Sequence, residues 1–439
     1  MVGTSLAKKL SADGHHVVVI AQEAAVVKQV QESMDVQVMQ GDAADGSLLQ
    51  SAGLMEAELI LAVTDSDENN IITTLMAQTY NPNAKIIARV RKKQFLDNPV
   101  IAKGLTLGGA MLFSPEHAAV EMVLDLLQVD HAFEVVPFKL GMVRIAGFHL
   151  GQDSPLLGRP LQECDLAKYS TLVVAVDQGG EVVIPSGRTV LQAADRVMLT
   201  TESPNGFAQI LPLLGRPPVQ HRKIVIAGGG WKGEQIAREI EKRGIPVVIL
   251  EKSLSRCQEL AESLDNVDVI HCDATDPATI RHMAKRASTL IGMTGQQEVN
   301  LVLCLLARQG GAGRTIALMD NEAYLTLAPT LGIDAVVSPK LAAVSKIMRF
   351  LSHSKVIDAA TAFNGQLDAI FVEVQARSRL LASPLKSLGL PKALIVAAVV
   401  RDEKMIVPKG DFNFIYGDKA LIITAAGHLH KLDLYLGAA

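Results

Sequence analysis

The sequence has few aromatic residues, and it carries no excess of positive charge. Aromatic residues make up 4% of the 439 residues, with a single Trp, too few for the stacking surfaces that bind single-stranded nucleic acid. The formal net charge is −4 at pH 7, so no global positive field attracts nucleic acid or an anionic membrane. We therefore expect no nucleic-acid partner.

Long apolar runs and paired cysteine motifs are also missing. The longest apolar runs, such as Ala393–Val400, fall far short of the ~20 residues that span a bilayer. The segment Met1–Thr4 does not open a secretory signal. Four cysteines occur without CxxC spacing, which favours reduced thiols in the cytoplasm over a disulfide framework or a zinc site. The sequence thus predicts a cytoplasmic protein that holds no metal ion.

What the sequence does contain is an internal duplication. Residues 3–23 align without a gap with residues 233–253, at an offset of 230. Further along, Thr64 recurs as Thr294 at the same offset. Hydrophobic residues make up 49% of the chain, enough for several cores. Two copies of one unit, each of about 200 residues, therefore account for the length.

Each copy divides into a larger and a smaller domain. Short apolar runs alternate with amphipathic stretches in the first part of each copy, which predicts an α/β fold with a doubly wound parallel sheet of the Rossmann type. The second part has strands and turns but few long helices, which predicts a small α+β domain. The predicted domains are residues 1–130 and 219–352 (Rossmann-like) and residues 131–218 and 353–439 (small α+β). The strands expected in the second Rossmann-like domain are Lys223–Ala227, Val247–Leu250, Val267–His271, Thr289–Met293, Thr315–Leu318 and Ala335–Val337.

The strongest chemical signal is a glycine-rich turn in the second copy. Residues 228–233 read GGGWKG and fit the GxGxxG pattern between a strand and a helix. In this pattern Gly228 allows the tight turn, Gly230 lets a pyrophosphate approach, and Gly233 lets the helix pack closely. Glu251 ends the next strand, where a carboxylate accepts hydrogen bonds from ribose hydroxyls and repels a 2′-phosphate. The pattern predicts NAD or NADH as the ligand.

The remaining residues of the turn are Gly229, Trp231 and Lys232. Lys232 can neutralise a phosphate, whereas Trp231 can equally crowd it. One alternative stays open, a nucleotide-free Rossmann domain that keeps its glycines for packing alone.

The first copy lacks most of this pattern. The chain begins near the third glycine of the turn, Gly3, and Ala21 stands where the second copy has Glu251. Two explanations stay open: the true start lies upstream and restores the strand and the glycines, or the first site is degenerate. A misplaced start does not explain the loss of the acid, so we favour degeneracy.

The duplication, the stretch AVTDSDENN at residues 62–70 and the stretch ARVR at residues 88–91 together resemble one family. This is the family of peripheral NAD-binding subunits of Trk potassium-uptake systems, which carry two "regulator of potassium conductance" units in tandem. The resemblance covers essentially the whole chain except the first strand, and it implies further nucleotide contacts. In the second copy these fall on Asp273, Thr294 and Gly295, and in the first copy on Val2, Gly3, Asp42, Thr64, Asp65 and Arg89.

The resemblance also implies that Arg89 reaches a phosphate. Its counterpart in the second copy is Leu318, which removes that contact there. Arg89 alternatively serves the other site across an interface, or it forms a surface salt bridge. The neighbouring acidic run Asp65–Glu68 either binds a divalent cation or, as we favour, is a solvated loop that caps the following helix.

No catalytic constellation is recognisable: the sequence has no Tyr-x-x-x-Lys pair after the Rossmann core and no Cys/His pair where a nicotinamide substrate would bind. A ligand that binds one conformation better shifts the population without chemistry. With the resemblance, this implies a non-enzymatic gating subunit that senses NAD(H), or else ATP or ADP, at the inner face of the cell membrane. Its implied partner is a membrane potassium-transporter subunit, and gating rings of eight Rossmann domains imply a homotetramer. The alternatives are an NAD-dependent oxidoreductase and a structural assembly subunit with vestigial sites.

Overall fold

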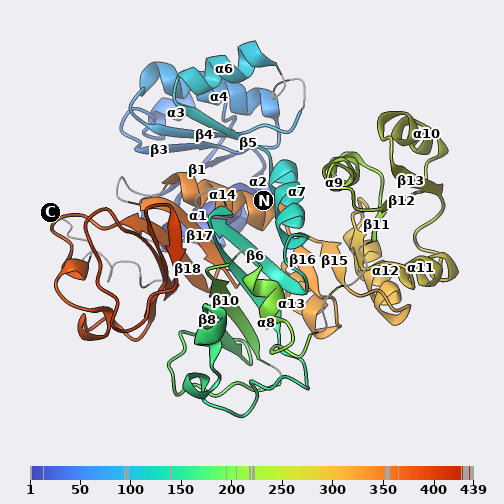
Figure 1. The fold of residues 1–439 in the computed structure, drawn as a ribbon. Helices are drawn as coiled ribbons and strands as arrows, with labels where there is room; N and C mark the ends of the chain where they lie inside the picture. The colour runs from blue at the N-terminus through green and yellow to red at the C-terminus, as the bar shows by residue number, and fades with distance from the viewer. Residues whose placement is uncertain are drawn as a thin grey trace. The chain divides into compact units, whose positions relative to one another are not determined.

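The computed structural model (Figure 1) describes residues 2–435, apart from 13, 93–94, 96–97, 139–140, 194, 204, 217–218, 220–222, 352–355, 364, 427 and 429–434. The chain divides into two compact units. The first contains Met1–Ala119 and Pro339–Ile347, and the second contains Val120–Ser338 and Met348–Ala439. The domain boundaries expected after residue 218 and between residues 352 and 353 involve residues outside those described.

The second Rossmann-like domain lies in the second unit, and its six predicted strands are confirmed to within one residue at each end. They are β11 (Ile224–Ala227), β12 (Val247–Glu251), β13 (Val267–His271), β14 (Thr289–Gly292), β15 (Thr315–Leu318) and β16 (Ala335–Val337). The helices are α9 (Trp231–Glu241), α10 (Leu254–Ser263), α11 (Pro277–Ala284), α12 (Gln297–Gln309) and α13 (Glu322–Thr330). All strands pair in parallel in the order β13-β12-β11-β14-β15-β16. The order reverses at β11, so a ligand site is expected at the carboxyl ends of β11 and β14.

Burial explains why the central strands of this sheet are continuous apolar runs. Every residue of β11, β14 and β15 is buried, as expected for a parallel sheet that helices cover. Helix α12 packs closely on β14, since a Cβ atom added to Gly292 would lie 3.2 Å from the carbonyl oxygen of Asn300. The first turn of α12 is therefore held beside the end of β14.

The first Rossmann-like domain lies in the first unit, and its sheet is in two parts. Its strands are β1 (Val18–Ala21), β2 (Gln37–Gln40), β3 (Leu59–Ala62), β4 (Lys85–Arg89) and β5 (Ala110–Phe113). Its helices are α1 (Val2–Ala12), α2 (Ala24–Ser33), α3 (Gly46–Ser51), α4 (Asp67–Tyr80) and α6 (Pro99–Leu107). The pair β1-β2 and the sheet β3-β4-β5 are separate. In the second copy β11 joins the corresponding strands β12 and β14, and none of the described residues takes the place of β11 in the first copy.

Two helices begin at the repeated Ser-Pro pairs. They are α7 (Pro115–Leu126) and α14 (Pro339–Leu351). The Ser114 hydroxyl accepts a hydrogen bond from the backbone N–H of His117 at 3.3 Å, which is the N-cap that the sequence predicts. The end of the second predicted helix, residues 352–355, lies outside the described part of the chain.

Both small domains, which lie in the second unit, are five-stranded antiparallel sheets with the same topology. The first consists of β6 (Ala132–Phe138), β7 (Val143–His149), β8 (Thr171–Gln178), β9 (Glu181–Val183) and β10 (Arg196–Thr201), in the order β6-β7-β10-β8-β9. The second consists of β17 (Val356–Ala362), β18 (Leu367–Glu373), β19 (Leu394–Arg401), β20 (Lys404–Ile406) and β21 (Lys419–Ala425), in the order β17-β18-β21-β19-β20. The first also carries the short helix α8 (Gly206–Ile210). The matching order confirms the duplication.

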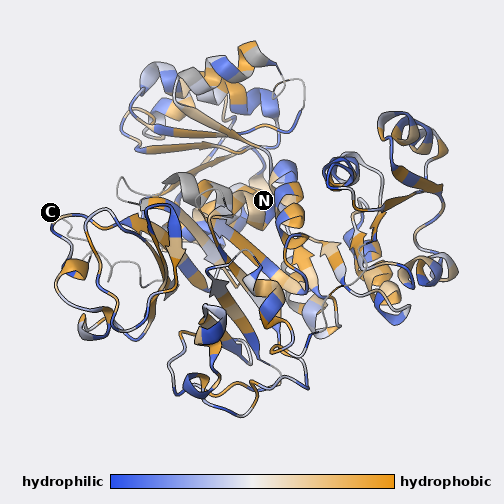
Figure 2. Cartoon of the chain, in the orientation of Figure 1, coloured by the Kyte–Doolittle hydropathy of each residue, from blue (hydrophilic) through white to orange (hydrophobic). Residues whose placement is uncertain are grey.

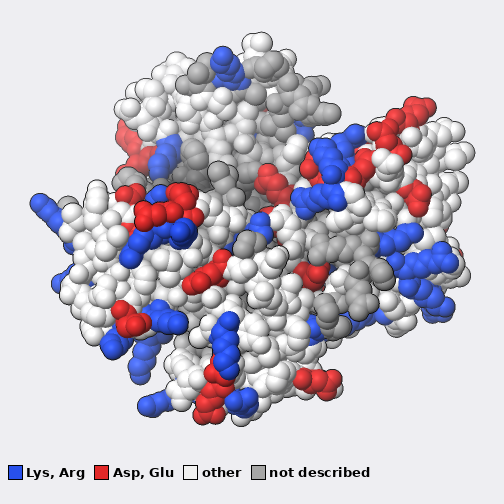
Figure 3. All heavy atoms as spheres, viewed as in Figure 1, with Lys and Arg blue, Asp and Glu red and all other residues white. Residues whose placement is uncertain are grey.

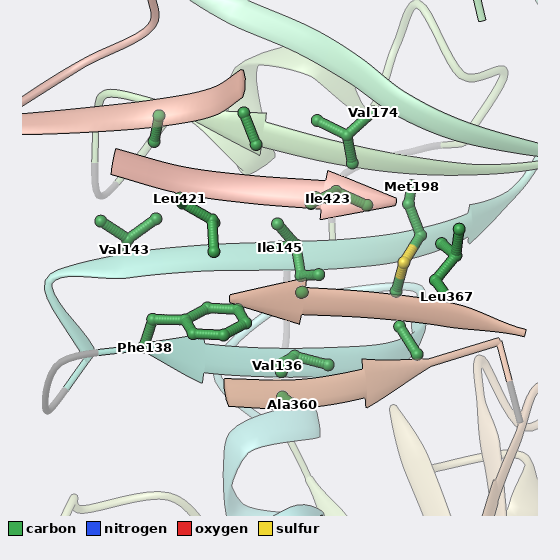
Figure 4. Packing of buried hydrophobic residues seen from close by; sticks show 14 of the residues in the cluster. Val136, Phe138, Val143, Ile145, Val174, Met198, Ala360, Leu367, Leu421 and Ile423 are labelled. Atoms are coloured by element: carbon green, nitrogen blue, oxygen red, sulfur yellow. The ribbon is translucent and has the colours of Figure 1, made fainter. Parts of the chain in front are cut away.

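The two small domains share one apolar core. Phe138 and Ile145 of the first domain belong to the same buried cluster as Ala360, Leu367 and Leu421 of the second (Figure 4). Apolar residues run along the strands of both sheets (Figure 2). Because burial of apolar surface is the main favourable term in folding, this shared core joins the two small domains into one body.

Charged side chains accompany this core where the two small domains meet. The guanidinium carbon of Arg196 lies 5.3 Å and 5.4 Å from the ring centres of Phe133 and Phe363. The Glu134 carboxylate accepts a hydrogen bond from the backbone N–H of Phe363 at 3.0 Å. A side chain of the first small domain therefore satisfies a backbone donor of the second.

Arg314 holds the connection between α7 and the first small domain. Its guanidinium donates hydrogen bonds to the carbonyl oxygens of Leu126 at 2.8 Å, of Val129 at 3.2 Å and of Ala132. Arg314 is 4% exposed, and this burial lowers its pKa to about 10. In the register that places Arg89 where Leu318 lies, the first copy has Lys85 at this position, and Lys85 is exposed where Arg314 is buried.

We predict that Arg314→Met destabilises the second unit by roughly 3 kcal/mol, because it leaves buried carbonyl groups without a donor. Urea unfolding of the full chain measures the loss. Arg243→Met is the matched control, because Arg243 is exposed and should tolerate the change within about 0.5 kcal/mol. Equal stability of the two variants would contradict the role given to the clamp.

We predict that Glu134→Gln removes a pH dependence from the stability of the paired small domains. Burial raises the pKa of Glu134 from 4.5 to about 7. A folded-state pKa above the unfolded one means that the wild type loses stability as pH rises from about 4.5 to 7, by an amount on the order of 3 kcal/mol. Calorimetric unfolding of both chains between pH 4.5 and 8 measures the difference.

His149 titrates in the opposite sense. Burial lowers the pKa of His149 from 6.5 to about 4, so its contribution to stability is lost as pH falls through that window. Because His149 is present in both chains, the difference between them isolates Glu134. Parallel pH profiles for the wild type and the Gln variant would show that the Glu134 carboxyl does not carry the effect.

Candidate functional site

The glycine-rich turn follows β11 directly, and two of its glycines are required by close contacts. Gly228 has φ of +115°, and a Cβ atom there would lie 2.8 Å from the backbone of Met293 and 2.9 Å from the nitrogen of Thr294. A Cβ atom on Gly233 would lie 2.1 Å from the carbonyl oxygen of Gly228. These contacts press the turn against the end of β14 and hold α9 close to β11.

Gly230 differs from its neighbours because the space around it is open. It is the N-cap residue of α9, with φ of −62° and no side-chain cap, and a Cβ atom there would meet nothing within 4 Å. The first N–H groups of the 11-residue helix α9 therefore begin beside an unfilled space. A helix N-terminus favours a bound phosphate.

Glu251 lies against the turn. Its two carboxylate oxygens accept hydrogen bonds from the backbone N–H groups of Gly229 and Ser253, each at 2.8 Å. A Cβ atom on Gly229 would lie 3.1 Å from the Glu251 carboxylate. Each oxygen keeps a further lone pair, so the carboxylate is oriented and still able to accept hydrogen bonds from a ribose.

Arg256 and Glu234 support the turn, and sequence reasoning missed both. The Arg256 guanidinium donates to the carbonyl oxygen of Gly229 at 2.9 Å and to the Glu234 carboxylate at 2.6 Å. Burial would raise the pKa of Glu234, but hydrogen bonds from Arg238 and Arg256 hold it below its usual value. In the sequence, Glu234 is recognisable only as an acidic residue in the first turn of α9. That position does not identify Arg256 on α10 as its partner.

Asp273 and Lys252 form an exposed ion pair after β12 and β13. Their charged groups lie 2.9 Å apart. The hydroxyl and backbone N–H of Thr275 donate to Asp273 at 2.7 Å and 2.9 Å. These hydrogen bonds, together with Lys252, hold the pKa of Asp273 well below its usual range. Asp273 is therefore ionised at neutral pH.

Asn300 fixes the loop that contains Thr294 and Gly295. Its amide oxygen accepts from the Thr294 backbone N–H at 2.8 Å and from the Thr294 hydroxyl at 2.7 Å. Its amide nitrogen donates to the carbonyl oxygen of Leu318 at 3.0 Å. Asn300 is 1% exposed. One buried amide thus ties the end of β14 to α12 and to the end of β15.

The first copy repeats this arrangement at Asn70. The Asn70 amide accepts from the Thr64 backbone N–H at 2.8 Å and from its hydroxyl at 2.7 Å, and it donates to the carbonyl oxygen of Arg89 at 2.9 Å. Arg89 therefore occupies the position that Leu318 holds in the second copy. The sequence analysis gave Asn70 and Asn300 no function, because nothing in the pattern indicates which backbone groups they would bind.

The Arg89 side chain is paired within the first unit. Its guanidinium donates to the Asp65 carboxylate at 2.7 Å and also to the carbonyl oxygen of Thr64. The Arg89 side chain is 6% exposed, whereas that of Asp65 is 73% exposed. The hydrogen bond from Arg89 lowers the pKa of Asp65. The pair is therefore half-buried and ties the loop after β3 to the end of β4.

The acidic run of the first copy is not fully solvated, contrary to expectation. Asp67 is 2% exposed, and its carboxylate accepts from the backbone N–H groups of Arg91 and Lys92 at 2.9 Å and 2.7 Å. The helix begins at Asp67, with Ser66 as N-cap. Within the described ranges, no three His, Cys, Asp or Glu side chains are grouped to hold a metal ion.

The other predicted residues of the first copy lie apart from any glycine turn. Asp42 accepts from the Asn69 side-chain amide at 2.9 Å. Val2 is buried in α1, and a Cβ atom on Gly3 would lie 3.1 Å from the Val63 side chain. In the second copy Trp231 and Lys232 are the first two residues of α9, and both are half-buried.

The fold and this turn define a protein with tandem Rossmann-type domains of the dinucleotide-binding kind, each followed by a small α+β domain. The TrkA-N domain model matches residues 1–103 and 224–339, and the TrkA-C domain model matches residues 145–215 and 370–437. The chain belongs to the TrkA family.

Relatives match over almost their whole length. The Trk system potassium uptake protein TrkA homolog 1 of Methanosarcina mazei is 31% identical, over 99% of this chain and 97% of the relative. The Trk system potassium uptake protein TrkA of Azorhizobium caulinodans is 27% identical, over 98% of this chain and 96% of the relative. Among solved structures, the GsuK RCK domain is similar with a TM-score of 0.58 at 20% identity, over all of this chain and 93% of that one. The GsuK channel bound to NAD gives a TM-score of 0.60 at 19% identity, over all of this chain and 77% of that one. These structures share the fold.

We predict opposite effects for alanine at two glycines of the turn. Gly228→Ala should destabilise the second unit by about 2 kcal/mol or more, since φ is positive and the added Cβ meets backbone. Gly230→Ala should leave stability within about 1 kcal/mol but abolish dinucleotide binding, because the methyl group fills the space that a pyrophosphate would enter. Urea unfolding and calorimetric titration with NADH measure the two effects. Full NADH affinity in Gly230→Ala would exclude this mode of binding.

Proposed function

We propose that this chain is a nucleotide-sensing regulatory subunit of a potassium uptake system, without chemistry of its own. The observation that carries the proposal is the pairing of an open glycine turn with an oriented carboxylate. Gly230 leaves free space at the start of α9, and Glu251 is held beside the turn by two backbone N–H groups. These are the features that a Rossmann domain uses to hold a pyrophosphate and a ribose.

The ligand that this site favours is NAD or NADH. The Glu251 carboxylate can accept from both ribose hydroxyls, and its charge would repel the 2′-phosphate of NADP. The GsuK neighbour named as bound to NAD supports the same ligand. ATP and ADP remain candidates, because they too carry a ribose and a pyrophosphate. The proposed site of the second copy consists of Gly228, Gly229, Gly230, Trp231, Lys232, Gly233, Glu251, Asp273, Thr294 and Gly295.

The first copy is proposed as the weaker site. Asp42, Thr64, Asp65 and Arg89 are present, but Ala21 stands in place of the ribose acid. Arg89 already neutralises Asp65, so a phosphate would have to replace an existing ion pair. Val2 and Gly3 would contribute only the start of a helix.

Regulation without catalysis requires only differential affinity. A ligand with a tenfold preference for one conformation shifts the equilibrium by about 1.4 kcal/mol. The names of the relatives, which are Trk system potassium uptake proteins, support a membrane potassium-transporter subunit as the partner. None of the helices within the described residues is long and apolar enough to cross a membrane. We propose that the chain acts from the cytoplasmic face, as a homotetramer of eight Rossmann domains.

We predict that the full chain binds NADH and that Glu251→Ala abolishes this binding. NADH at a concentration of 100 times its Kd should raise the apparent free energy of unfolding by about 2.7 kcal/mol. Thermal unfolding and calorimetric titration with NADH, NAD, ATP and ADP measure it. Glu262→Ala is the matched control, because Glu262 is an exposed acid on the neighbouring helix α10 and should bind as the wild type does.

Three outcomes would contradict the proposal. If none of the four nucleotides binds, the glycine turn serves only to pack the helix against the sheet. Turnover of NADH with a panel of keto acids would favour an oxidoreductase. Nucleotide binding that does not change potassium uptake, when the chain is reconstituted with the transporter encoded beside it or copurified with it, would exclude a gating role.

A further inference from the structure

A cluster of basic side chains lies on the second Rossmann-like domain, away from the glycine turn. Arg281 and His282 are in the last turn of α11, and Lys285 and Arg286 follow directly. All four are exposed. Within the described part of the chain, none of them forms an ion pair, whereas Arg308 on the adjacent helix α12 is paired with Asp334 at 2.8 Å. We call Arg281, His282, Lys285 and Arg286 the α11 basic patch.

The structure holds this patch rigidly. Helix α11 packs on α12, and a Cβ atom added to Gly310 would lie 2.9 Å from the Ala284 Cβ atom and 3.0 Å from the Arg281 Cα atom. Ala284 and Ala287, which flank Lys285 and Arg286 in the sequence, are buried. Figure 3 shows Lys and Arg atoms gathered over the region where Figure 1 labels α11. The charges are thus displayed on a fixed surface.

The fold does not require these cations. Counted from the N-cap residues of the corresponding helices α3 and α11, the first copy has Gln50, Ser51, Leu54 and Met55 at these positions, and it still forms parallel strands and the helix α3. Cations in the last turn of a helix interact favourably with the helix dipole, but Lys285 and Arg286 lie beyond the last helical residue. The charge is also local, since the chain as a whole carries −4.

The patch and the glycine turn lie at opposite edges of the same sheet. Helix α11 begins after β13, at the carboxyl edge of the sheet, and the chain then enters β14 from the amino edge. Arg281–Arg286 occupies this return, whereas the turn at Gly228 follows the carboxyl end of β11. A contact at the patch therefore leaves the proposed nucleotide site free.

The composition of the patch indicates the chemistry of its partner. None of the exposed large apolar side chains among the described residues falls between 281 and 286. Specific protein interfaces have an apolar, well-packed centre with charge depleted, and this patch has the reverse composition. Clustered Lys and Arg side chains without an apolar centre suit the phosphate and carboxylate groups of an anionic lipid surface, which attract each cation without a packed fit.

We propose that the α11 basic patch docks the second Rossmann-like domain on an anionic lipid surface. The inference rests on the proposed function only in that the chain must work beside a membrane, and it does not depend on nucleotide binding. Attraction of about 1 kcal/mol for each Lys or Arg predicts that removal of three such charges weakens binding on the order of a hundredfold.

Vesicle flotation with the full chain tests the proposal. The probes are vesicles of phosphatidylcholine alone and vesicles in which about 30% of that lipid is replaced by phosphatidylserine. Each is used at about 0.1 M and 0.5 M NaCl, between which the Debye length falls about twofold. The wild type should bind only the anionic vesicles and only at the lower salt concentration. Arg281→Gln/Lys285→Gln/Arg286→Gln should lose this binding.

Lys392→Gln/Lys404→Gln/Lys409→Gln is the matched control. It removes the same number of positive charges from exposed positions of the second small domain, and it should bind the vesicles as the wild type does. Equal loss of vesicle binding in both triple variants would show that only the net charge of the chain matters, and it would overturn the proposal. Binding of the wild type to neutral vesicles would also overturn it. If the chain binds a polyglutamate peptide but no vesicles, the partner of the patch is an acidic protein. That result would overturn the proposal of a lipid surface.

A thermal shift with NADH separates this proposal from the proposed function. The patch variant should keep the full NADH response, because the patch lies at the opposite edge of the sheet. Vesicle binding without any NADH response would leave the docking surface standing and remove the nucleotide site. An NADH response without vesicle binding would do the reverse.

Discussion

A single buried amide organises the carboxyl edge of each Rossmann-like sheet. Asn300 binds the backbone and the hydroxyl of Thr294 and also the carbonyl group of Leu318, and Asn70 repeats these contacts with Thr64 and Arg89. An unpaired buried polar group costs about 1–3 kcal/mol, so this loop has one low-energy arrangement. The glycine turn packs against that loop through Gly228, and its geometry therefore depends on the amide.

The two copies keep this amide and differ in the charges around it. The second copy has Glu251 beside its turn and Leu318 at the end of β15. The first copy has Ala21 and Arg89 at the same positions, and its arginine is paired with Asp65. A duplicated framework has thus been kept for its hydrogen bonds, while the groups that would select a ligand have diverged. The α11 basic patch diverges in the same way.

Features that depend on local pattern could be predicted from the sequence. The six strands of the second sheet are largely apolar runs, so their positions could be predicted. Gly228, Gly233 and Glu251 occur at a fixed spacing, so the shape of the turn could be predicted as well. Contacts between distant segments could not be predicted. Arg256 reaches Gly229 from the next helix, and Arg314 reaches Leu126 from 188 residues away. The shared core of the small domains was also invisible, because an apolar strand does not indicate which sheet will cover it.

Strand β15 lies between the Thr294 loop and the Arg314 clamp in the second copy. The strand is four residues long and fully buried. Leu318 at its end is held by the amide that fixes Thr294, and Arg314, just before its start, clamps the carbonyl groups of Leu126 and Val129. A close-packed interior transmits displacement instead of absorbing it. The Thr294 loop and the Arg314 clamp are thus anchored at opposite ends of one buried strand, so strain at either end acts on the same four residues.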